Sequence, residues 1–395
     1  MATIINADTS NGLKLTSDTS GEIELQSAGV TKAKITSSGL QNASGNPITS
    51  QAGKNRIING NMAINQRGSA SYDITGAVYT LDRYRGGASI ASKFSIAPGT
   101  TTPPAGFTNY LQVTSSAATT PGSTDTYSFF QRVEGYNVAD LNWGTSDAQT
   151  VTMSFWVRST LTGTFGGKLQ NSAQDRIYIF SYTISSANTW EKKSITITGD
   201  TTGTWLTTNG VGLSINFSVG AGSGAEATAG SWGTDNVPMQ PTGSTNVVAT
   251  SGATWQITGL QLETGTTATD FEHLQYGQQL ALCQRYFQSS WSQGSAVGSA
   301  VSITTNSVQQ SWGSLNAGIA GQAFLLPVTM RTLPTLVVYD MALTTGKVTT
   351  LGNGAAQTNN VSANNSATTT NMFYVRLYAN SVAGLAFAYT LTAEL

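Results

Sequence analysis

Apolar and polar positions alternate through residues 11–41 of the chain. Glycines and Ser-Gly pairs divide this stretch into shorter runs. Its apolar residues are Leu13, Leu15, Ile23, Leu25, Val30, Ala33 and Ile35. This period-2 pattern predicts three short β-strands in residues 11–41. Ordering each residue costs about 1–2 kcal/mol, and so few apolar side chains cannot offset that cost within one chain. We therefore expect residues 1–52 to be an attachment and trimerisation segment that folds only in an intertwined trimer or against a partner.

Residues 42–55 show no periodicity and are rich in Gly, Pro, Ser and Asn, which is typical of a linker. They lead into NRIINGNMAINQRG, residues 55–68, where Asn59-Gly60 stands between two short apolar runs. Asn-Gly in this position is typical of a tight turn. We interpret the run as the boundary between the linker and the globular body, with a ligand-binding loop as the alternative.

From about residue 56 to residue 272, short β-rich segments follow one another and are separated by turn residues. The clearest are 150–160, 175–184, 192–200, 210–220 and 253–263. Their alternation favours antiparallel strands with one face buried and one face in water. Repeated strands with glycine-rich turns and no intervening helix indicate a jelly roll, to which we assign residues 53–273.

One segment, residues 274–288, has a helical period instead. Its apolar positions recur at spacings of four, three and four, which places them on one helix face: Tyr276, Leu280, Cys283 and Phe287. We interpret residues 274–289 as a single connecting helix.

Residues 290–395 form a second unit with β-rich segments at 323–330, 334–340, 372–380 and 385–395. Between them, residues 344–371 are expected to be a long loop with at most short strands. The expected fold is therefore all-β: a short-strand N-terminal segment, a central antiparallel β-sandwich of the jelly-roll type, one connecting helix and a C-terminal β-sandwich, assembled as a trimer.

Composition excludes two classes of partner. Charged residues are only 10% of the 395 residues, and the net charge is −1 without a basic run interleaved with aromatics. A nucleic-acid partner is therefore not expected. No stretch approaches the roughly 18 consecutive apolar residues of a membrane helix, and the amino terminus lacks the pattern of a signal peptide. We expect a protein that is made in the cytoplasm without export and that does not insert into a membrane.

The chain has one cysteine, Cys283, and one histidine, His273. This inventory excludes a disulfide within the chain and a multi-thiolate zinc site. On a helix the two residues would lie about three turns apart, which is beyond hydrogen-bond reach for a catalytic pair. We assign a packing or capping role to His273 and a buried packing role to Cys283.

Paired carboxylates are the remaining route to catalysis, since a glycosidase needs two Asp or Glu side chains roughly 5–10 Å apart. No recognisable arrangement connects the candidates, and we interpret them as surface or turn groups: Asp175, Glu226, Asp235, Glu263 and Glu272. A Ca²⁺ site made of Asp and backbone carbonyls stays open, although no EF-hand spacing supports it. We expect no enzyme activity, no catalytic residue and no cofactor.

Four tryptophans in Gly-, Ser- and Thr-rich contexts are the candidate glycan contacts: Trp143, Trp205, Trp232 and Trp291. An indole exposed on a loop stacks on a sugar ring beside amides that donate hydrogen bonds. Packing inside the protein is the alternative for the same side chains. Trp156, Trp190 and Trp255 fall in strand-like patterns and are expected in the core.

The stretch YTLDRYRGG, residues 79–87, brings Asp82 next to Arg83 and Arg85. A half-buried ion pair or a turn is one interpretation. The alternative is that two guanidiniums beside tyrosines hold an acidic sugar.

Several strings together resemble a known family. NRIINGNMAINQRG, YTLDRYRGG, VTMSFWVRST, NTWEKKSITITGDTTGTW and ITGLQLETGTTATDFEHLQYGQQLALCQRYFQ occur in this order between residues 55 and 290. They are similar to bacteriophage tail-fibre and tail-associated receptor-binding proteins with a carbohydrate-binding-module-like jelly roll. The likeness extends loosely to FLLPVTMRTLPTLVVYD in the C-terminal unit.

The resemblance implies a virion structural protein located in the phage tail and usually trimeric. Residues 1–52 would attach it to a tail or baseplate protein, and the distal domains would contact host cell-surface polysaccharide. The family supplies no catalytic residues, and the matching side chains are framework rather than receptor contacts: Asp82, Arg83, Trp190, Glu263, Phe271 and Glu272. The N-terminal segment lacks a long coiled-coil or collagen-like shaft, which suggests a compact fibre.

Three functions remain after this reading. The first is a non-enzymatic tail fibre that adsorbs to host glycan through many weak contacts. The second is a structural connector or decoration protein of the tail or capsid without receptor contact. The third is a polysaccharide depolymerase, against which stand the missing acid/base pair and the absence of β-helix repeats.

Overall fold

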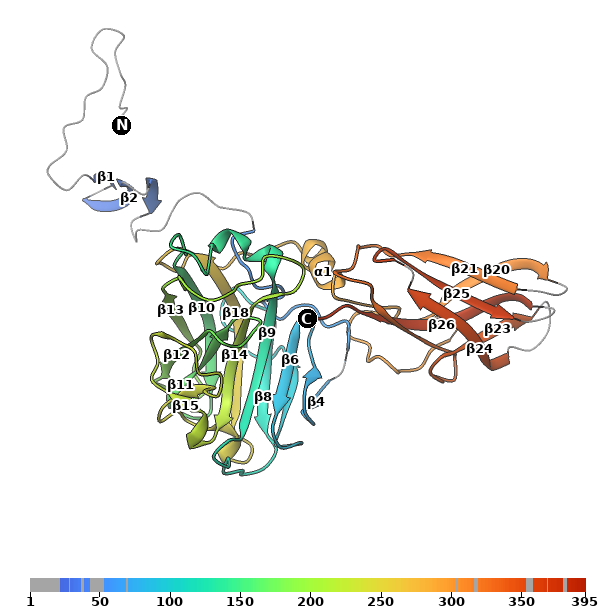
Figure 1. Cartoon of the computed structure of the whole chain (residues 1–395), viewed down its shortest axis with the longest axis horizontal. Coiled ribbons are helices and arrows are strands. Elements are labelled where there is room, and N and C mark those ends of the chain that lie inside the picture. The colour runs from blue at the N-terminus through green and yellow to red at the C-terminus, as the bar shows by residue number, and fades with distance from the viewer. Residues whose placement is uncertain are drawn as a thin grey trace, which may run out of the picture.

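The computed structural model describes residues 22–27, 29–36, 39–42, 53–68, 70–302, 305–315, 319–352, 358–367, 369–378 and 382–395. Their regular elements are almost all β-strands (Figure 1). A large sandwich is joined through one helix, α1, to an elongated C-terminal β domain. The prediction of an all-β chain is confirmed.

A three-stranded antiparallel sheet forms near the amino terminus from β1 (Ile23–Ser27), β2 (Val30–Thr36) and β3 (Gly39–Asn42). Its register pairs Ile23 with Ile35, Leu25 with Ala33, and Ile35 with Leu40, so apolar side chains share one face. Leu25, Ile35 and Leu40 are more than 40% exposed, because no other element in the described part of the chain covers this face. The predicted strand that contains Leu13 and Leu15 lies outside the described residues.

The sandwich consists of two antiparallel sheets. The six-stranded sheet has the order β13 (Glu191–Ile197), β10 (Val151–Ser159), β18 (Thr254–Thr264), β8 (Tyr110–Ser115), β7 (Phe94–Gly99) and β4 (Tyr72–Asp73). The seven-stranded sheet has the order β16 (Trp232–Gly233), β12 (Ile177–Ile184), β11 (Gly163–Gln170), β14 (Val211–Ala221), β9 (Thr126–Glu134), β6 (Tyr84–Ala88) and β5 (Val78–Tyr79). Short elements complete the body: η1 (Gly135–Asn137), η2 (Ala139–Leu141), η3 (Ser223–Ala225), η4 (Val247–Ala249), and the parallel pair β15 (Glu226–Ala227) and β17 (Gln240–Pro241).

Alternate residues of these strands meet between the two sheets. On β14, the core takes Leu213, Ile215, Phe217 and Val219. Phe217 stacks on Phe129 of β9 with ring centroids 5.2 Å apart, and both rings contact Trp255 of β18. Since every second side chain is taken by the core, the remaining ones on each strand point away from it and form the outer faces of the sandwich.

Residues 55–68 lie at the boundary between the sandwich and the C-terminal part of the chain. Ile57 and Met62 join the sandwich core, whereas Ile58 and Ile64 pack with Cys283 and Tyr286. Asn59 has φ 60°, and its side chain bonds both the amide and the carbonyl of Ile64 at 2.9 Å. A tight turn therefore forms here, as the Asn-Gly signal predicts, but it is held by a buried asparagine side chain and is not flanked by strands.

Helix α1 (Tyr276–Gln284) is shorter than the sequence predicts. The helical period extends to Phe287, but Phe287–Ser289 form strand β19, which pairs with the last strand of the chain. Because Phe287 is buried in this strand, tertiary strand pairing overrides the local helical pattern. Tyr276 is exposed, so the predicted apolar face of the helix is only partly buried.

The C-terminal domain is built around its last strand, β26 (Val382–Thr392). One end of β26 pairs with β19 and β22 (Thr335–Tyr339), and the other end pairs with β20 (Val308–Leu315) and β23 (Lys347–Gly352). β24 (Thr358–Ala367), β25 (Met372–Tyr378) and β21 (Ile319–Leu325) extend the sheet beyond β23. The prediction of a long loop over residues 344–371 is therefore wrong: polar strands β23 and β24 occupy it, because pairing with neighbours supplies the order that apolar residues do not.

Buried ion pairs connect the two domains. Glu394 pairs with Arg83 and, at 2.9 Å, with Arg67 of the sandwich. The Arg331 side chain donates to the carbonyls of Asn209, Ala393 and Glu394. Arg285 and the Tyr286 hydroxyl both bond the Glu134 carboxylate at 2.6 Å. These contacts hold the C-terminal strand against the sandwich.

Candidate binding face of the seven-stranded sheet

Three of the four candidate tryptophans pack against one another. The rings of Trp143, Trp205 and Trp232 meet edge to face with centroids 4.8–5.4 Å apart. Each indole N–H donates to a backbone carbonyl, of Gln149, Thr202 and Thr198 respectively. This arrangement closes one end of the sandwich core and favours the packing role for these side chains.

A pocket beside this cluster is lined by Val138, Ala139, Leu141, Trp143, Trp205, Leu206, Thr207 and Leu213. The volume accessible to the centre of a water molecule in this pocket is only about 10 Å³. That is room for one water molecule and not for a sugar ring.

The fourth candidate, Trp291, is buried against Tyr339 in the C-terminal domain, with ring centroids 5.3 Å apart. The expectation for Trp255 holds, since it is fully buried in the core. The expectation of a core position is wrong for Trp156 and Trp190, because both are half-buried and lie outside the core. Their strand pattern identifies a sheet position but does not say which side faces the core.

Each candidate carboxylate accepts hydrogen bonds from residues of a loop. Glu263 accepts from the amide and hydroxyl of Thr269, and Glu272 accepts from the amides of Gly53 and Asn55. Asp175, Glu226 and Asp235 likewise bond nearby loop residues. His273 is exposed and packs against Phe107 and Phe271, and burial raises the pKa of the Cys283 thiol. Within the described residues, no three His, Cys, Asp or Glu side chains gather as a metal site.

The side chains of Asp82, Arg83 and Arg85 lie in three different environments. Asp82 is fully buried, accepts from the Gln66 amide and side chain at 2.6 Å, and does not pair with its neighbour. Arg83, at φ 73° in a turn, pairs with Glu394. Arg85 points the other way, onto the outer face of the seven-stranded sheet, beside Phe130 and Tyr79. Only Arg85 therefore stays available to a ligand.

Arg85 begins a row of side chains that crosses five strands. The register pairs Arg85 of β6 with Phe130 of β9, Phe130 with Asn216 of β14, Asn216 with Lys168 of β11, and Lys168 with Ile179 of β12. A second row runs beside it through Arg132, Ser214 and Gln170. We call seven residues of these two rows the cationic face. They are Arg85, Phe130, Asn216 and Lys168 of the first row and Arg132, Ser214 and Gln170 of the second.

The side chains at the centre of the cationic face are smaller than those on either side of it. Strand β14 presents only the small side chains of Ser214, Asn216 and Ser218 here, whereas β9 and β11 present Phe130, Arg132, Lys168 and Gln170. Ser214 and Asn216 are nevertheless less than 5% exposed, which is unusual for an outer face. The larger side chains on both sides and the 228–239 loop near Lys168 shield them.

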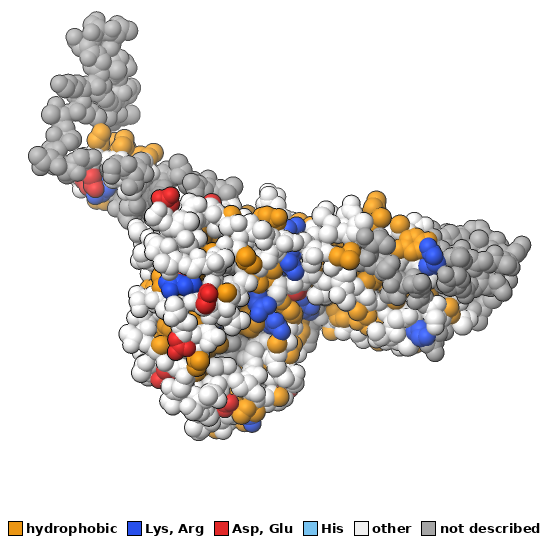
Figure 2. Space-filling model, in the orientation of Figure 1, with side chains coloured by type: hydrophobic (Ala, Val, Ile, Leu, Met, Phe, Trp, Pro, Cys, Tyr) orange, Lys and Arg blue, Asp and Glu red, His pale blue; other side chains and the backbone are white. Residues whose placement is uncertain are grey.

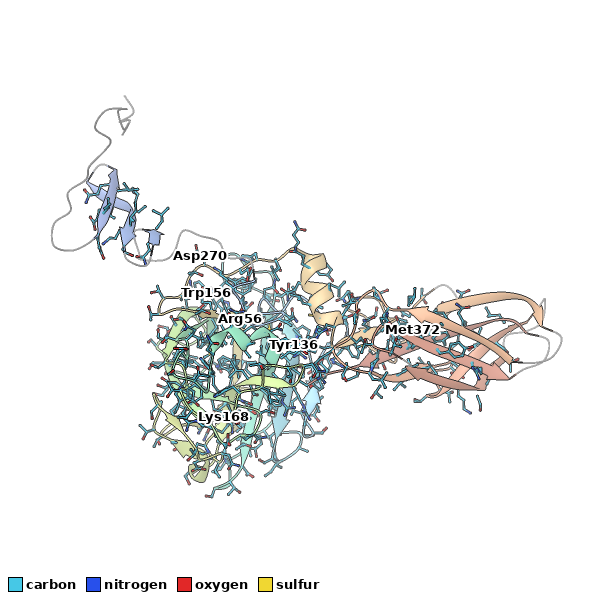
Figure 3. The ribbon with its side chains drawn as sticks, turned by 45° about the horizontal axis from the view of Figure 1, so that its top comes forward. Arg56, Tyr136, Trp156, Lys168, Asp270 and Met372 are labelled. Carbon is cyan, nitrogen blue, oxygen red and sulfur yellow. The ribbon has the colours of Figure 1, made fainter. Side chains whose placement is uncertain are left out.

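Lys168 is the most perturbed cation of this face. Figure 3 labels it on the sandwich body, away from the C-terminal domain. Only 5% of the residue is exposed, and burial lowers the pKa of its ammonium to about 8, although nearby Asp235 acts in the opposite direction. Its hydrogen bond within the described chain is a long one, 3.4 Å to the Asn236 carbonyl. The side-chain oxygen of its neighbour Gln170 is buried without a partner.

The two arginines add further positive charge. Burial, and then the charges of Arg85 and Arg83, lower the pKa of the Arg132 guanidinium. Arg132 donates to the Leu395 backbone oxygen at 2.9 Å, and the Arg85 Nε is buried without an acceptor. Among the described residues, neither arginine nor Lys168 forms a salt bridge. Figure 2 shows both basic and acidic side chains over the body of the sandwich.

The outer face of the six-stranded sheet is different. Arg158 donates to Gln256, Gln256 to Gln112 at 2.6 Å, and Gln112 to Thr114 at 3.1 Å. Trp190 donates to the Thr102 carbonyl and packs on Tyr110. Most polar groups named on this face satisfy one another, and the Thr258 hydroxyl is the buried exception. The cationic face differs in that its unsatisfied groups lie beside three cations, which makes it the better candidate for ligand contacts.

Sequence reasoning did not find Lys168, Gln170, Asn216, Ser214, Phe130 and Arg132. The only available signal is that polar residues alternate with apolar ones on three separate strands. Which strands are neighbours depends on the topology, since β9, β14 and β11 are not consecutive in sequence.

Comparison with known proteins gives distant structural likenesses. No family model and no curated protein matches the chain. The enzymatically active domain of tailspike protein 4 from bacteriophage CBA120 is similar over 54% of this chain, at 10% identity and a TM-score of 0.30; the match spans 22% of that domain. A putative sugar-binding protein from Bacteroides thetaiotaomicron (11% identity, TM-score 0.31) matches 53% of this chain and 100% of its own.

A family 11 carbohydrate-binding module from Clostridium thermocellum, in complex with a mixed-linked tetrasaccharide, is also similar. It matches 50% of this chain and 97% of its own, at 10% identity and a TM-score of 0.25. Values this low transfer neither a binding residue nor an activity. Within the described residues, no helix has the length and apolar character needed to cross a membrane.

Proposed function

We propose that this protein is a non-enzymatic tail fibre of a bacteriophage that binds polysaccharide on the host surface through the cationic face. One observation carries the binding assignment: buried polar groups on an outer face that the protein itself leaves unsatisfied. Hydroxyl, amide, aromatic and cationic side chains lie side by side there, which is the set that orients a sugar chain. The tail-fibre assignment rests on the five ordered sequence strings.

The N-terminal sheet supports a trimeric assembly. No other described residues of the chain cover its apolar face of Ile23, Leu25, Ala33, Ile35 and Leu40, while the other face carries the Lys34 ion pairs with Glu22 and Glu24. Two further copies of the chain would bury this face and complete a small core. Three binding faces per fibre then raise the apparent affinity through effective concentration.

The test uses the full-length protein and whole bacteria from a panel of strains. We expect cell binding to strains of one surface-polysaccharide type, and competition by that purified polysaccharide. Asn216→Trp fills the centre of the cationic face and should abolish binding, whereas Ser194→Trp on the exposed outer face of β13 should not. Absence of binding to all strains and polysaccharides would instead favour a structural connector, and release of oligosaccharides from the polysaccharide would indicate an enzyme.

A further inference from the structure

We propose that the ligand of the cationic face is an anionic glycan, one whose sugars carry carboxylate or phosphate groups. This inference rests on the proposed function, because it names the class of glycan for the same site. It follows from three cations, Arg85, Arg132 and Lys168, that belong to three strands of one sheet face and that form no ion pair with an acidic side chain among the described residues.

The spacing of these cations suits a chain rather than a single sugar. Arg85 on β6 and Lys168 on β11 are three strand spacings apart, about 14 Å at the usual distance between strands. Arg132 lies between them on β9, next to Phe130. Between them, β14 presents the small side chains of Ser214 and Asn216, each less than 5% exposed.

The charge balance argues against a neutral ligand. Two acidic side chains of this region are already engaged: Glu394 pairs with Arg67 and Arg83, and Asp235 accepts from the Val237 amide. Arg132 has a backbone partner in the Leu395 oxygen, whereas Lys168 is buried with only a weak hydrogen bond. A neutral sugar would bury Lys168 and Arg85 further without compensating their charge, which is costly. An anionic group would instead form charge-assisted hydrogen bonds with them.

The guanidiniums are pre-positioned for such an anion. Arg85 packs on the Tyr79 ring at 5.3 Å, and both Arg85 and Arg132 lie near the Phe130 ring at 5.8 and 5.6 Å. Aromatic packing fixes a guanidinium without using its hydrogen-bond donors. Arg132 uses one donor on the Leu395 oxygen, and the Arg85 Nε has no acceptor among the described residues.

The experiment is a printed array of bacterial surface polysaccharides probed with the full-length protein. Each polysaccharide is printed in its native form, after reduction of its carboxylates to alcohols, and after removal of its phosphates with hydrogen fluoride. We expect binding to native anionic polysaccharides and loss of binding after one of the two treatments, which identifies the anionic group. Lys168→Met and Arg132→Gln should each weaken binding at least tenfold, and the effect should shrink in high salt.

Lys192→Met is the matched control, because Lys192 is an exposed lysine on the other sheet and should not matter. Binding to neutral polysaccharides, or undiminished binding after both treatments, overturns the anionic assignment and leaves glycan binding intact. Binding to no polysaccharide on the array contradicts the proposed function itself. Thermal unfolding of every variant verifies that lost binding is not lost folding.

Discussion

At the residue scale, Lys168 lowers the stability of the fold but provides a positive charge for the proposed binding function. A buried ammonium without a carboxylate partner destabilises the native state, and its lowered pKa measures that effect. Sites whose side chains oppose stability are frequently functional. Arg83 shows the contrast, since it is equally buried but has its carboxylate partner Glu394.

Lys168→Met should therefore stabilise the protein. The ammonium titrates at about 8 in the folded state and near 10.5 when unfolded, so the unfolded state binds more protons between these values. The free energy of unfolding of the wild type should rise with pH from about 8 to 10.5, and at pH 7 the substitution should add on the order of 2–3 kcal/mol. Urea unfolding at pH 7 and pH 10 measures both effects; a destabilised variant at pH 7 would contradict the argument.

At the element scale, the connection between strand β9 and the segment that follows helix α1 depends on one buried carboxylate. Burial alone would raise the pKa of Glu134, but hydrogen bonds from Arg285 and Tyr286 hold it below its usual value. The stabilisation is therefore present above the unfolded pKa near 4.5 and is lost as the pH falls through the lower folded value.

Glu134→Gln should destabilise the protein by about 3 kcal/mol at pH 7, because the Arg285 guanidinium loses its anionic partner. Urea unfolding followed by tryptophan fluorescence measures the loss, which should shrink at pH 3. Asp140→Asn is the control: its ion pair with Arg56 is largely exposed, so a change below about 0.5 kcal/mol is expected. Equal effects of the two substitutions would show that burial of the pair does not matter.

The strands of the sandwich and of the C-terminal domain show how far sequence patterns reach. Alternation located β10, β12, β13, β14 and β18 because each presents an apolar face to one core. It missed β23 and β24, whose residues are mainly Thr, Asn and Ser and gain their order from strand pairing. The end of α1 was misplaced for a related reason, since Phe287 fits a helical period but pairs with Thr392 in a strand.

At the scale of the whole molecule, the proposed trimer rests on the N-terminal sheet. Its strands bury almost nothing within one chain, and Val30 is 56% exposed. Such a sheet needs a partner surface to offset the entropy of ordering it.

We expect light scattering to give three times the mass of one chain. The double substitution Leu25→Lys and Ile35→Lys places charges on the apolar face of this sheet and should yield the single-chain mass, with the sandwich unchanged by circular dichroism. Lys32→Glu is the control, since this exposed side chain lies outside that apolar face. A wild-type protein that stays a single chain at micromolar concentration would contradict the trimer.

The sequence by itself determined the all-β class, the existence of most sandwich strands and the weakness of the N-terminal segment as an independent unit. These properties depend on local periodicity and composition, which one chain segment carries alone. The tertiary structure decided where the tryptophans pack and which side chains share the cationic face. Trp143, Trp205 and Trp232 pack against one another, and the cationic face exists only because β6, β9, β14 and β11 become neighbours. Strand adjacency and side-chain burial are properties of the folded chain, so no local pattern contains them.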